Sequence, residues 1–189
     1  MQVTVVILLF MVALPVFAGS AAVEALLLAR KARDTSDVRY YGRAEELIAP
    51  LLRANPEDFE ALKVRTCVLL GQHRFREALE LARKLNKRAP DDLQVYGFVV
   101  DACMELGLYK EAEQAAQWML DLRPGNVAGL TRGAYVRELF GDLDGALDFM
   151  RQAYTRTRPE ETGDRAWILT QIGHLLIDKG EYASAQKGD

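Results

Sequence analysis

Apolar residues recur along most of this chain at intervals of three, four and seven. Short stretches with glycine, proline or polar residues separate the runs. Leu79, Ala82 and Leu85 illustrate the spacing within one run. Such intervals place apolar side chains on one face of an α-helix. We therefore predict an all-α chain without β-strands. Helices are expected at about 59–71, 74–88, 93–106 and 109–122, with breaks near residues 55–57, 72–74, 89–91, 106–108, 123–126 and 140–142.

Two residue types keep a common period of 34 residues across these helices. The prolines are Pro56, Pro90 and Pro124, and the alanines are Ala44, Ala78, Ala112 and Ala146. A proline ends a helix because it lacks the backbone N–H and clashes with the preceding turn. A small alanine early in a second helix lets two helix backbones approach closely. A fixed period of this size is typical of an array of helix–turn–helix units.

The predicted turns between paired helices also have a recurring residue. Gly107, Gly141 and Gly180 fall there, and glycine reaches left-handed backbone angles without steric cost. In one unit His73 stands at the equivalent place, and we expect it to be exposed in the turn. Asp142 follows a turn glycine and is expected to cap the next helix. A bulky residue lies shortly before each recurring alanine: Tyr41, Phe75, Tyr109 and Leu143.

These positions resemble the tetratricopeptide repeat, a helix pair of 34 residues with preferred residue types at fixed positions. The last unit matches best, through Leu169, Gly173, Leu176, Gly180, Tyr182 and Ala185. The resemblance spans about residues 22–187. It implies a right-handed superhelical solenoid of about four or five antiparallel helix pairs over residues 19–189. An ordinary helical bundle with an accidental period is the alternative.

Several features depart from the repeat pattern. Repeat position 8, where glycine or alanine is usual, holds Thr66 in one unit and Val100 in the next. About three extra residues fall within 33–39, and about five, around 159–164, precede the last unit. These insertions are expected to lengthen loops and to leave the helix pairs intact.

The second helix of the last unit has only about nine residues before the sequence ends at Asp189. A helix of that length is marginal in water. We therefore expect the last repeat to be truncated and the chain to be a fragment of a longer repeat protein. The surface around Leu169, Ile172 and Leu176 should then be incompletely covered. It should fray, or take part in self-association with a second copy of the chain.

The N-terminal residues have a different pattern. Residues 1–18 contain no charged side chain, and Val3 to Phe17 is nearly continuously apolar. Small residues follow, from Ala18 to Ala21. This order is typical of a secretory signal peptide at 1–18, cleaved after Ala18, although no Lys or Arg precedes the apolar run. The chain is thus predicted to be exported, to the periplasm or as a secreted protein.

Two alternatives for the N-terminal segment stay open. An uncleaved anchor through residues 3–18 would attach the protein to a membrane. The apolar run of about 15 residues would reach roughly 23 Å as a helix, short of the ~30 Å of a hydrocarbon core. The segment could instead be a buried first helix of the array, but it shows no polar face.

Charge and motifs narrow the function. The chain has 24 basic and 27 acidic residues, a net charge of −3. This balance lacks the basic surface that binding nucleic acid requires. The two histidines, His73 and His174, have no Cys or His at metal-ligand spacing. The sequence also lacks a glycine-rich phosphate loop and a nucleophile elbow. We predict no enzymatic activity, no cofactor and no metal.

The family resemblance implies a binding groove lined by positions 2, 5, 9 and 12 of each first helix, which share one helix face. Tyr135 and Trp167 are the expected anchors, because amphipathic aromatic side chains carry much of the energy of protein interfaces. Lys63, Asp101 and His174 complete the candidate partner-binding set. The alternative is that this wall is simply solvated.

Some family members clamp the C-terminal carboxylate of a partner with lysine and asparagine. Lys63 and Arg132 match two of those places in type, but Cys67 and Asp101 stand where asparagines are required. We therefore do not predict that activity. The predicted function is a non-catalytic, exported scaffold that binds a protein or peptide segment. The alternatives are the repeat portion of a larger enzyme and a membrane-anchored assembly factor.

Overall fold

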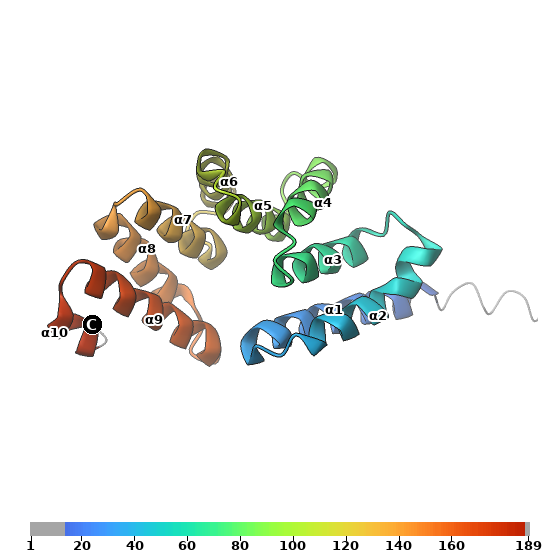
Figure 1. The fold of residues 1–189 in the computed structure, drawn as a ribbon, viewed down its shortest axis with the longest axis horizontal. Coiled ribbons are helices and arrows are strands. Elements are labelled where there is room, and N and C mark those ends of the chain that lie inside the picture. Colours follow the sequence, from blue (N-terminus) through green and yellow to red (C-terminus); the bar gives the residue numbers. More distant parts are fainter. Residues whose placement is uncertain (1–13, 188–189) are drawn as a thin grey trace, which may run out of the picture. The chain divides into compact units, whose positions relative to one another are not determined.

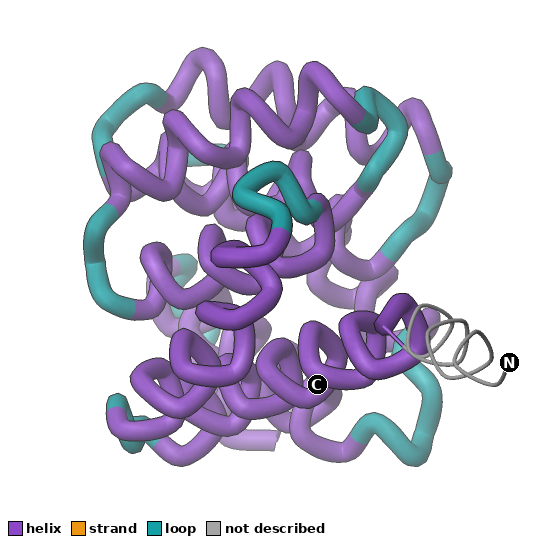
Figure 2. Tube along the Cα trace, turned by 90° about the vertical axis from the view of Figure 1, so that its right-hand side faces the viewer, coloured by secondary structure: helices purple, strands orange, loops and turns teal. Residues whose placement is uncertain are grey.

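The computed structural model describes residues 14–187, which form ten helices and no β-strand (Figures 1 and 2). The helices are α1 (Leu14–Thr35), α2 (Arg39–Ala54), α3 (Phe59–Gly71), α4 (Phe75–Arg88), α5 (Leu93–Glu105), α6 (Tyr109–Leu122), α7 (Val127–Leu139), α8 (Leu143–Arg156), α9 (Thr162–Asp178) and α10 (Tyr182–Lys187). They divide into an N-terminal unit, α1–α4, and a C-terminal unit, α5–α10. In each unit consecutive helices pack as pairs, so the prediction of an all-α array of helix pairs is confirmed.

The helix starts agree with the sequence prediction to within one residue for α3 to α6, and the six predicted breaks all fall between helices. Side-chain caps explain several starts. Asp58 accepts a hydrogen bond from the backbone N–H of Ala61 at 2.9 Å, and Asp142 accepts one from Gly145 at 2.9 Å. A carboxylate there satisfies a backbone donor that has no partner within the helix. The predicted cap at Asp142 is therefore confirmed.

The turns between paired helices have the predicted left-handed backbone. The φ angle is +72° at Gly107, +80° at Gly141 and +79° at Gly180. His73 has φ +59° and is exposed in the equivalent turn. Its ring meets that of Phe75 edge-on, with centroids 5.4 Å apart. One unit therefore has a histidine in the left-handed conformation. Glycine adopts this conformation without strain, whereas it costs other residues about 1 kcal/mol or more.

The recurring alanines belong to the buried core. Ala44, Ala78, Ala112 and Ala146 are all completely buried, as the repeat predicts. Thr66, one of the departures from the pattern, is also buried. Its hydroxyl donates to the carbonyl of Leu62 at 2.9 Å, so the extra polar group is satisfied within its own helix.

In the N-terminal unit, α1 packs on both α2 and α3, and one apolar cluster joins the three helices. The extra residues between α1 and α2 form a turn in which Ser36 has a left-handed φ of +54°. Asp37 accepts from the backbone and the guanidinium of Arg39, at 3.1 Å and 2.7 Å. These hydrogen bonds lower the pKa of Asp37 to about 2.

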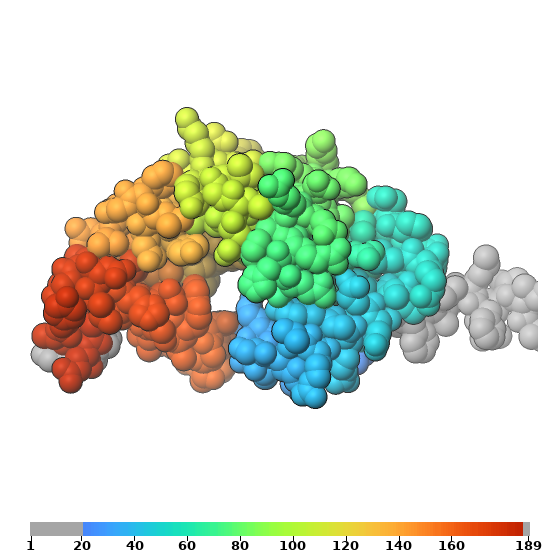
Figure 3. Space-filling view, viewed as in Figure 1, coloured from blue at the N-terminus to red at the C-terminus, as the bar shows by residue number. Residues whose placement is uncertain are grey.

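In the C-terminal unit, α7 packs against α5, α6 and α8, and α8 packs against α9. The apolar residues of α7, α8 and α9 form one cluster, and these helices make a continuous surface in the space-filling view (Figure 3). The insertion before α9 is tied back by Arg165. Its guanidinium donates to the carbonyls of Tyr154 and Thr157, at 3.2 Å and 2.9 Å.

We expected the apolar surface of the last repeat to be incompletely covered, and only part of it is exposed. Leu169 is 37% exposed, but Ile172 and Leu176 are 4% and 0% exposed. The prediction was wrong for these two residues, because α8 and the partly buried Ala185 cover them. Within the described residues α10 comprises Tyr182–Lys187.

Most of the predicted signal segment lies outside the described residues. α1 begins at Leu14 and includes the residues on both sides of the predicted cleavage site. Ala22, Ala25, Ala29 and Ala32 of α1 are buried, and all four follow that site. None of the helices in residues 14–187 combines the length and apolar character needed to cross a membrane.

Candidate interaction face

The first helices of the C-terminal unit, α5, α7 and α9, carry four of the five candidate binding residues. Tyr135 on α7 is 45% exposed, and Trp167 on α9 is 50% exposed. His174 is also exposed. It lies two turns beyond Trp167 on the same side of α9, because residues seven apart share a helix face. Aromatic side chains this accessible are available to pack against another molecule.

We define the first-helix face as Tyr135 and Glu138 of α7 with Trp167, His174, Ile177 and Asp178 of α9. Ile177 is 48% exposed, so the face offers aliphatic as well as aromatic surface. Large apolar side chains at this exposure, grouped on neighbouring helices, mark an interaction site more often than isolated ones do.

Glu138 links the two helices of this face electrostatically. Partial burial raises its pKa above the ordinary value, and the negative charge of Asp178 raises it further. His174 acts in the opposite direction. The charges of Asp178 and His174, both on α9, therefore reach Glu138 of α7, which belongs to a different repeat.

Tyr135 lies beside a second carboxylate of the neighbouring repeat. Burial raises the pKa of its phenol, and the charges of Glu105 on α5 and Glu138 on its own helix add to this effect. Negative charges from two helices, α5 and α7, thus act on the phenol of Tyr135.

Asp101 lies on the first helix α5, as predicted, and it is paired with a residue of α7. Its carboxylate accepts two hydrogen bonds from the guanidinium of Arg132, at 2.7 Å and 2.6 Å. Arg132 also donates to the carbonyl of Gly97 at 3.3 Å and covers that glycine. A bidentate pair of this kind is strong and directional. Asp101 therefore joins α5 to α7 rather than presenting an uncompensated charge to a partner.

Lys63 belongs to the N-terminal unit. Its side chain is only 12% exposed, and its ammonium nitrogen lies 3.8 Å from the carboxylate of Glu60 and 5.6 Å from the ring centre of Phe59. Arg88 lies over the same ring at 5.1 Å. Lys63 thus packs within its own repeat.

Sequence reasoning overlooked Glu105 and Asp178. Both stand at repeat position 13, counting from Leu93 and Ala166 as the first positions of their units. The predicted groove stopped at position 12. The signal was present in the sequence as two carboxylates at equivalent positions, one residue past the assumed edge of the helix face.

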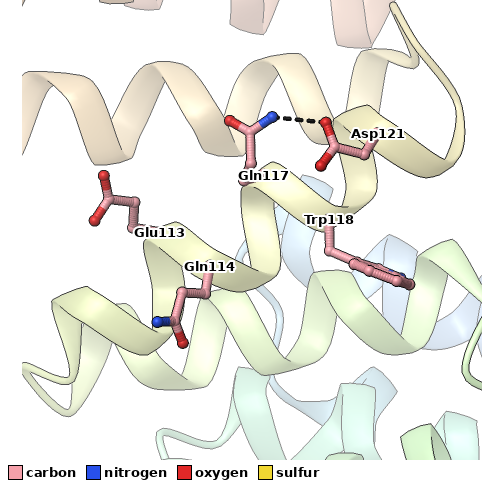
Figure 4. Close-up of a pocket in the computed structure, with 5 residues that line it drawn as sticks. All are labelled: Glu113, Gln114, Gln117, Trp118 and Asp121. Carbon is pink, nitrogen blue, oxygen red and sulfur yellow. Dashed lines mark hydrogen bonds between the residues drawn. The ribbon is translucent and has the colours of Figure 1, made fainter.

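A second exposed aromatic, Trp118, lies on the second helix α6 and was not predicted. It is 49% exposed, and its ring centre lies 6.2 Å from that of Tyr96. The residues around it line an open hollow of about 360 Å³, formed by α6 alone. Within that hollow the amide of Gln117 donates to Asp121 at 2.8 Å (Figure 4).

Another hollow, of about 290 Å³, lies among α6, α7 and α8. Gly133 lines this hollow. A Cβ added to Gly133 would lie about 3.0 Å from the ring of Phe149. Arg137 covers that ring at 4.2 Å. The side chains that line this hollow already contact one another. We therefore interpret the hollow as a shallow packing defect between repeats.

The chemistry available on these surfaces is that of recognition. In the described part of the chain, His, Cys, Asp and Glu side chains do not gather in groups of three that could hold a metal ion. The first-helix face offers instead aromatic surface, an aliphatic side chain and carboxylates, which are groups that bind polypeptide segments.

Comparison with known proteins gives the fold a precedent. A search of family models and a search of curated proteins find no match. Among solved structures, a thermophilic TPR protein of Thermus thermophilus is similar over 88% of this chain and 87% of its own, with 22% identity and a TM-score of 0.72. MamA is similar over 90% of this chain and 88% of its own, with 17% identity and a TM-score of 0.57. MamA of Desulfovibrio magneticus is similar over 89% of this chain and 90% of its own, with 12% identity and a TM-score of 0.59.

Proposed function

Because the chain has the tetratricopeptide-repeat fold, we propose that it is a non-catalytic scaffold that binds a protein or peptide segment. Repeats of this kind stack into extended surfaces that suit the binding of other chains. The binding surface is the first-helix face. The proposal thus assigns binding to the C-terminal unit.

The exposure of Tyr135 and Trp167 is the observation that carries this proposal. Both stand at predicted groove positions on first helices, and both keep about half of their surface in water. Leaving that much aromatic surface hydrated forgoes stabilisation of roughly 25 cal/mol per Å² of apolar area. A bound segment would recover it. If this helix face were only solvated and bound no partner, the aromatic residues at both positions would have no explanation.

A photocrosslinking amino acid tests the site of binding. Placed at Trp167 in cells that produce the chain, it should yield discrete crosslinked species. The same amino acid at Trp118, which is equally exposed but on a second helix, is the matched control. Species that form only from Trp118 would place the binding surface on α6 and contradict the proposal.

Truncation of the two aromatics should weaken binding of the captured partner. We expect Tyr135→Ala or Trp167→Ala to cost about 1–3 kcal/mol of binding free energy, because buried aromatic anchors are typical hot spots. Isothermal titration calorimetry measures the change, and Trp118→Ala should bind as the unmodified chain does. Binding that survives both changes but is lost in variants of Arg83 or Arg88 would move the site to the second helices.

We further propose that the chain acts after export. The proposal rests on the apolar, uncharged residues 1–18 and the small residues that follow. Cleavage after Ala18 would retain the buried alanines of α1, so the packing of the N-terminal unit would be kept. Mass spectrometry of the mature chain should find a first residue near Gly19. An intact Met1 on membrane-bound protein would support the anchor instead.

A further inference from the structure

Three carboxylates at the first-helix face have no Lys or Arg in an ion pair with them among the described residues; His174 is the basic group that acts on one of them, Glu138. Glu105, Glu138 and Asp178 form no ion pair with any Lys or Arg of residues 21–186. Other acidic residues of this unit do form ion pairs: Asp101, Asp142, Asp144, Glu161 and Glu181. The negative charge is therefore concentrated at one end of the first helices.

Two basic residues on these helices or directly after them are held by other groups. The guanidinium of Arg132 donates two hydrogen bonds to the carboxylate of Asp101. Lys179, directly after α9, lies 2.7 Å from carboxylate oxygens of both Asp144 and Glu181. Each of these cations would have to break a short contact before it could neutralise Glu138 or Asp178.

The carboxylates also repel one another. The charge of Asp178 acts on Glu138, which is already partly desolvated. Two like charges at a few ångströms repel by about 1 kcal/mol in water and by more near a protein surface. A cation from outside the chain would relieve this repulsion and would lose little hydration at such an exposed place.

Apolar surface adjoins the charges. Tyr135 lies beside Glu105 and Glu138, and Ile177 directly precedes Asp178 on α9. Trp167 lies further along the same side of that helix. Aromatic faces attract Lys and Arg side chains through cation–π contacts as well as apolar groups by burial. The face thus matches a ligand that carries both kinds of side chain.

We propose that the first-helix face, with Glu105 at its border, takes a cationic amphipathic polypeptide segment. Lys or Arg side chains of the segment pair with Glu105, Glu138 and Asp178, and its apolar side chains pack on Tyr135, Trp167 and Ile177. This inference rests on the proposed function and specifies the chemistry of the partner. The charge complementarity also steers the encounter, so binding should weaken as salt rises.

A random dodecapeptide library displayed on phage tests the inference without assuming a partner. Peptides are selected on the full chain and then screened on Trp167→Ala, and only those that need Trp167 are kept. The kept pool should carry a clear excess of Lys and Arg over Asp and Glu relative to the unselected library. A synthetic peptide from this pool should bind more weakly at 500 mM than at 50 mM salt.

Charge variants then test the pairing directly. The double variant Glu138→Gln with Asp178→Asn should weaken that peptide about tenfold, a typical effect of removing charges across an interface. Glu113→Gln with Asp121→Asn on α6 removes the same charge from another exposed surface and should change the affinity by less than about twofold.

Three results would overturn the inference. The first is a kept pool that is neutral or acidic, which would leave the scaffold function intact. The second is a Trp167-dependent dimer of the chain that competes with the selected peptides, seen by sedimentation velocity. The third is an empty pool, in which case the crosslinking at Trp167 decides separately whether the scaffold function stands.

Discussion

At the scale of single residues, backbone conformation decides what a glycine position tolerates. Gly107 has φ +72°, and a Cβ added there would meet no atom within 4 Å. Gly173 lies inside α9, and a Cβ would again meet nothing within 4 Å. Neither position has a steric limit, so only the backbone angle distinguishes them.

The same substitution should therefore have opposite effects at these two glycines. Gly107→Ala should lower the free energy of unfolding by about 1 kcal/mol, because alanine is strained in the left-handed region. Gly173→Ala should raise it by about 0.5–1 kcal/mol, because alanine favours the helix interior. Urea denaturation measures both. Equal signs would show that one of the two backbones is misassigned.

Glu138 makes stability depend on pH. Its folded-state pKa is raised above the ordinary 4.5, so the folded chain binds this proton more tightly than the unfolded chain. Stability therefore falls as the pH rises from 4.5 through the raised pKa. Glutamine is neutral throughout. Glu138→Gln should raise the thermal midpoint at pH 7.5, and the gain should vanish near pH 4. A gain of the same size at both pH values would contradict the assignment.

At the scale of helices, the contact between paired helices depends on one small side chain per repeat. The four recurring alanines are completely buried, and each lies early in a second helix. No larger residue fits such a contact without moving the helices apart. This explains why alanine keeps the 34-residue period while neighbouring positions vary.

Overpacking one of these contacts should be costly. Ala112→Leu is expected to reduce the free energy of unfolding by about 1–3 kcal/mol. Ala166→Leu, at an exposed position of α9, is the matched control and should stay within about 0.5 kcal/mol. Chemical denaturation followed by circular dichroism compares the two. Similar values for both would mean that the alanine contact is not close-packed.

Helix boundaries were predictable because their causes are local. Asp58 caps α3 through a backbone N–H three residues away, and the turn glycines set their own φ angles. His73 was placed in a turn by the repeat alone, and it adopts the glycine conformation there. These features depend on a few neighbouring residues, which the sequence shows directly.

At the scale of the whole molecule, stability in a repeat array is a sum of contacts between neighbouring helices. In the C-terminal unit α7 packs on α5, α6 and α8, whereas among the described residues the main packing partner of α10 is α9. Tyr182, the first residue of α10, is 68% exposed. Protection against hydrogen exchange should therefore differ strongly within this unit.

We expect the amides of α10 to exchange at least about a hundredfold faster than those of α6. A six-residue helix with exposed side chains opens locally at little cost. Hydrogen exchange followed by mass spectrometry resolves the two segments. Exchange of α10 as slow as that of α6 in a monomer would mean that contacts not seen here hold the last helix.

The candidate site was only partly predictable. Tyr135, Trp167 and His174 are exposed as the helix-face argument requires. The ion pair of Asp101 was not predicted, because its partner, Arg132, comes from the next repeat. Lys63 is largely covered within its own repeat. Helix periodicity predicts which side of a helix a residue lies on, but not which side chain from another helix reaches it.

The sequence by itself determined the helices, the turns and the close alanine contacts of this protein, because a 34-residue period repeats the same local causes. Only the tertiary structure decided the electrostatics of the first-helix face and the cover of the last repeat. Glu138 meets Asp178 from a different repeat, and α8 buries Ile172 and Leu176. Such contacts join residues distant in sequence, and their geometry depends on how helices pack, which no single repeat encodes.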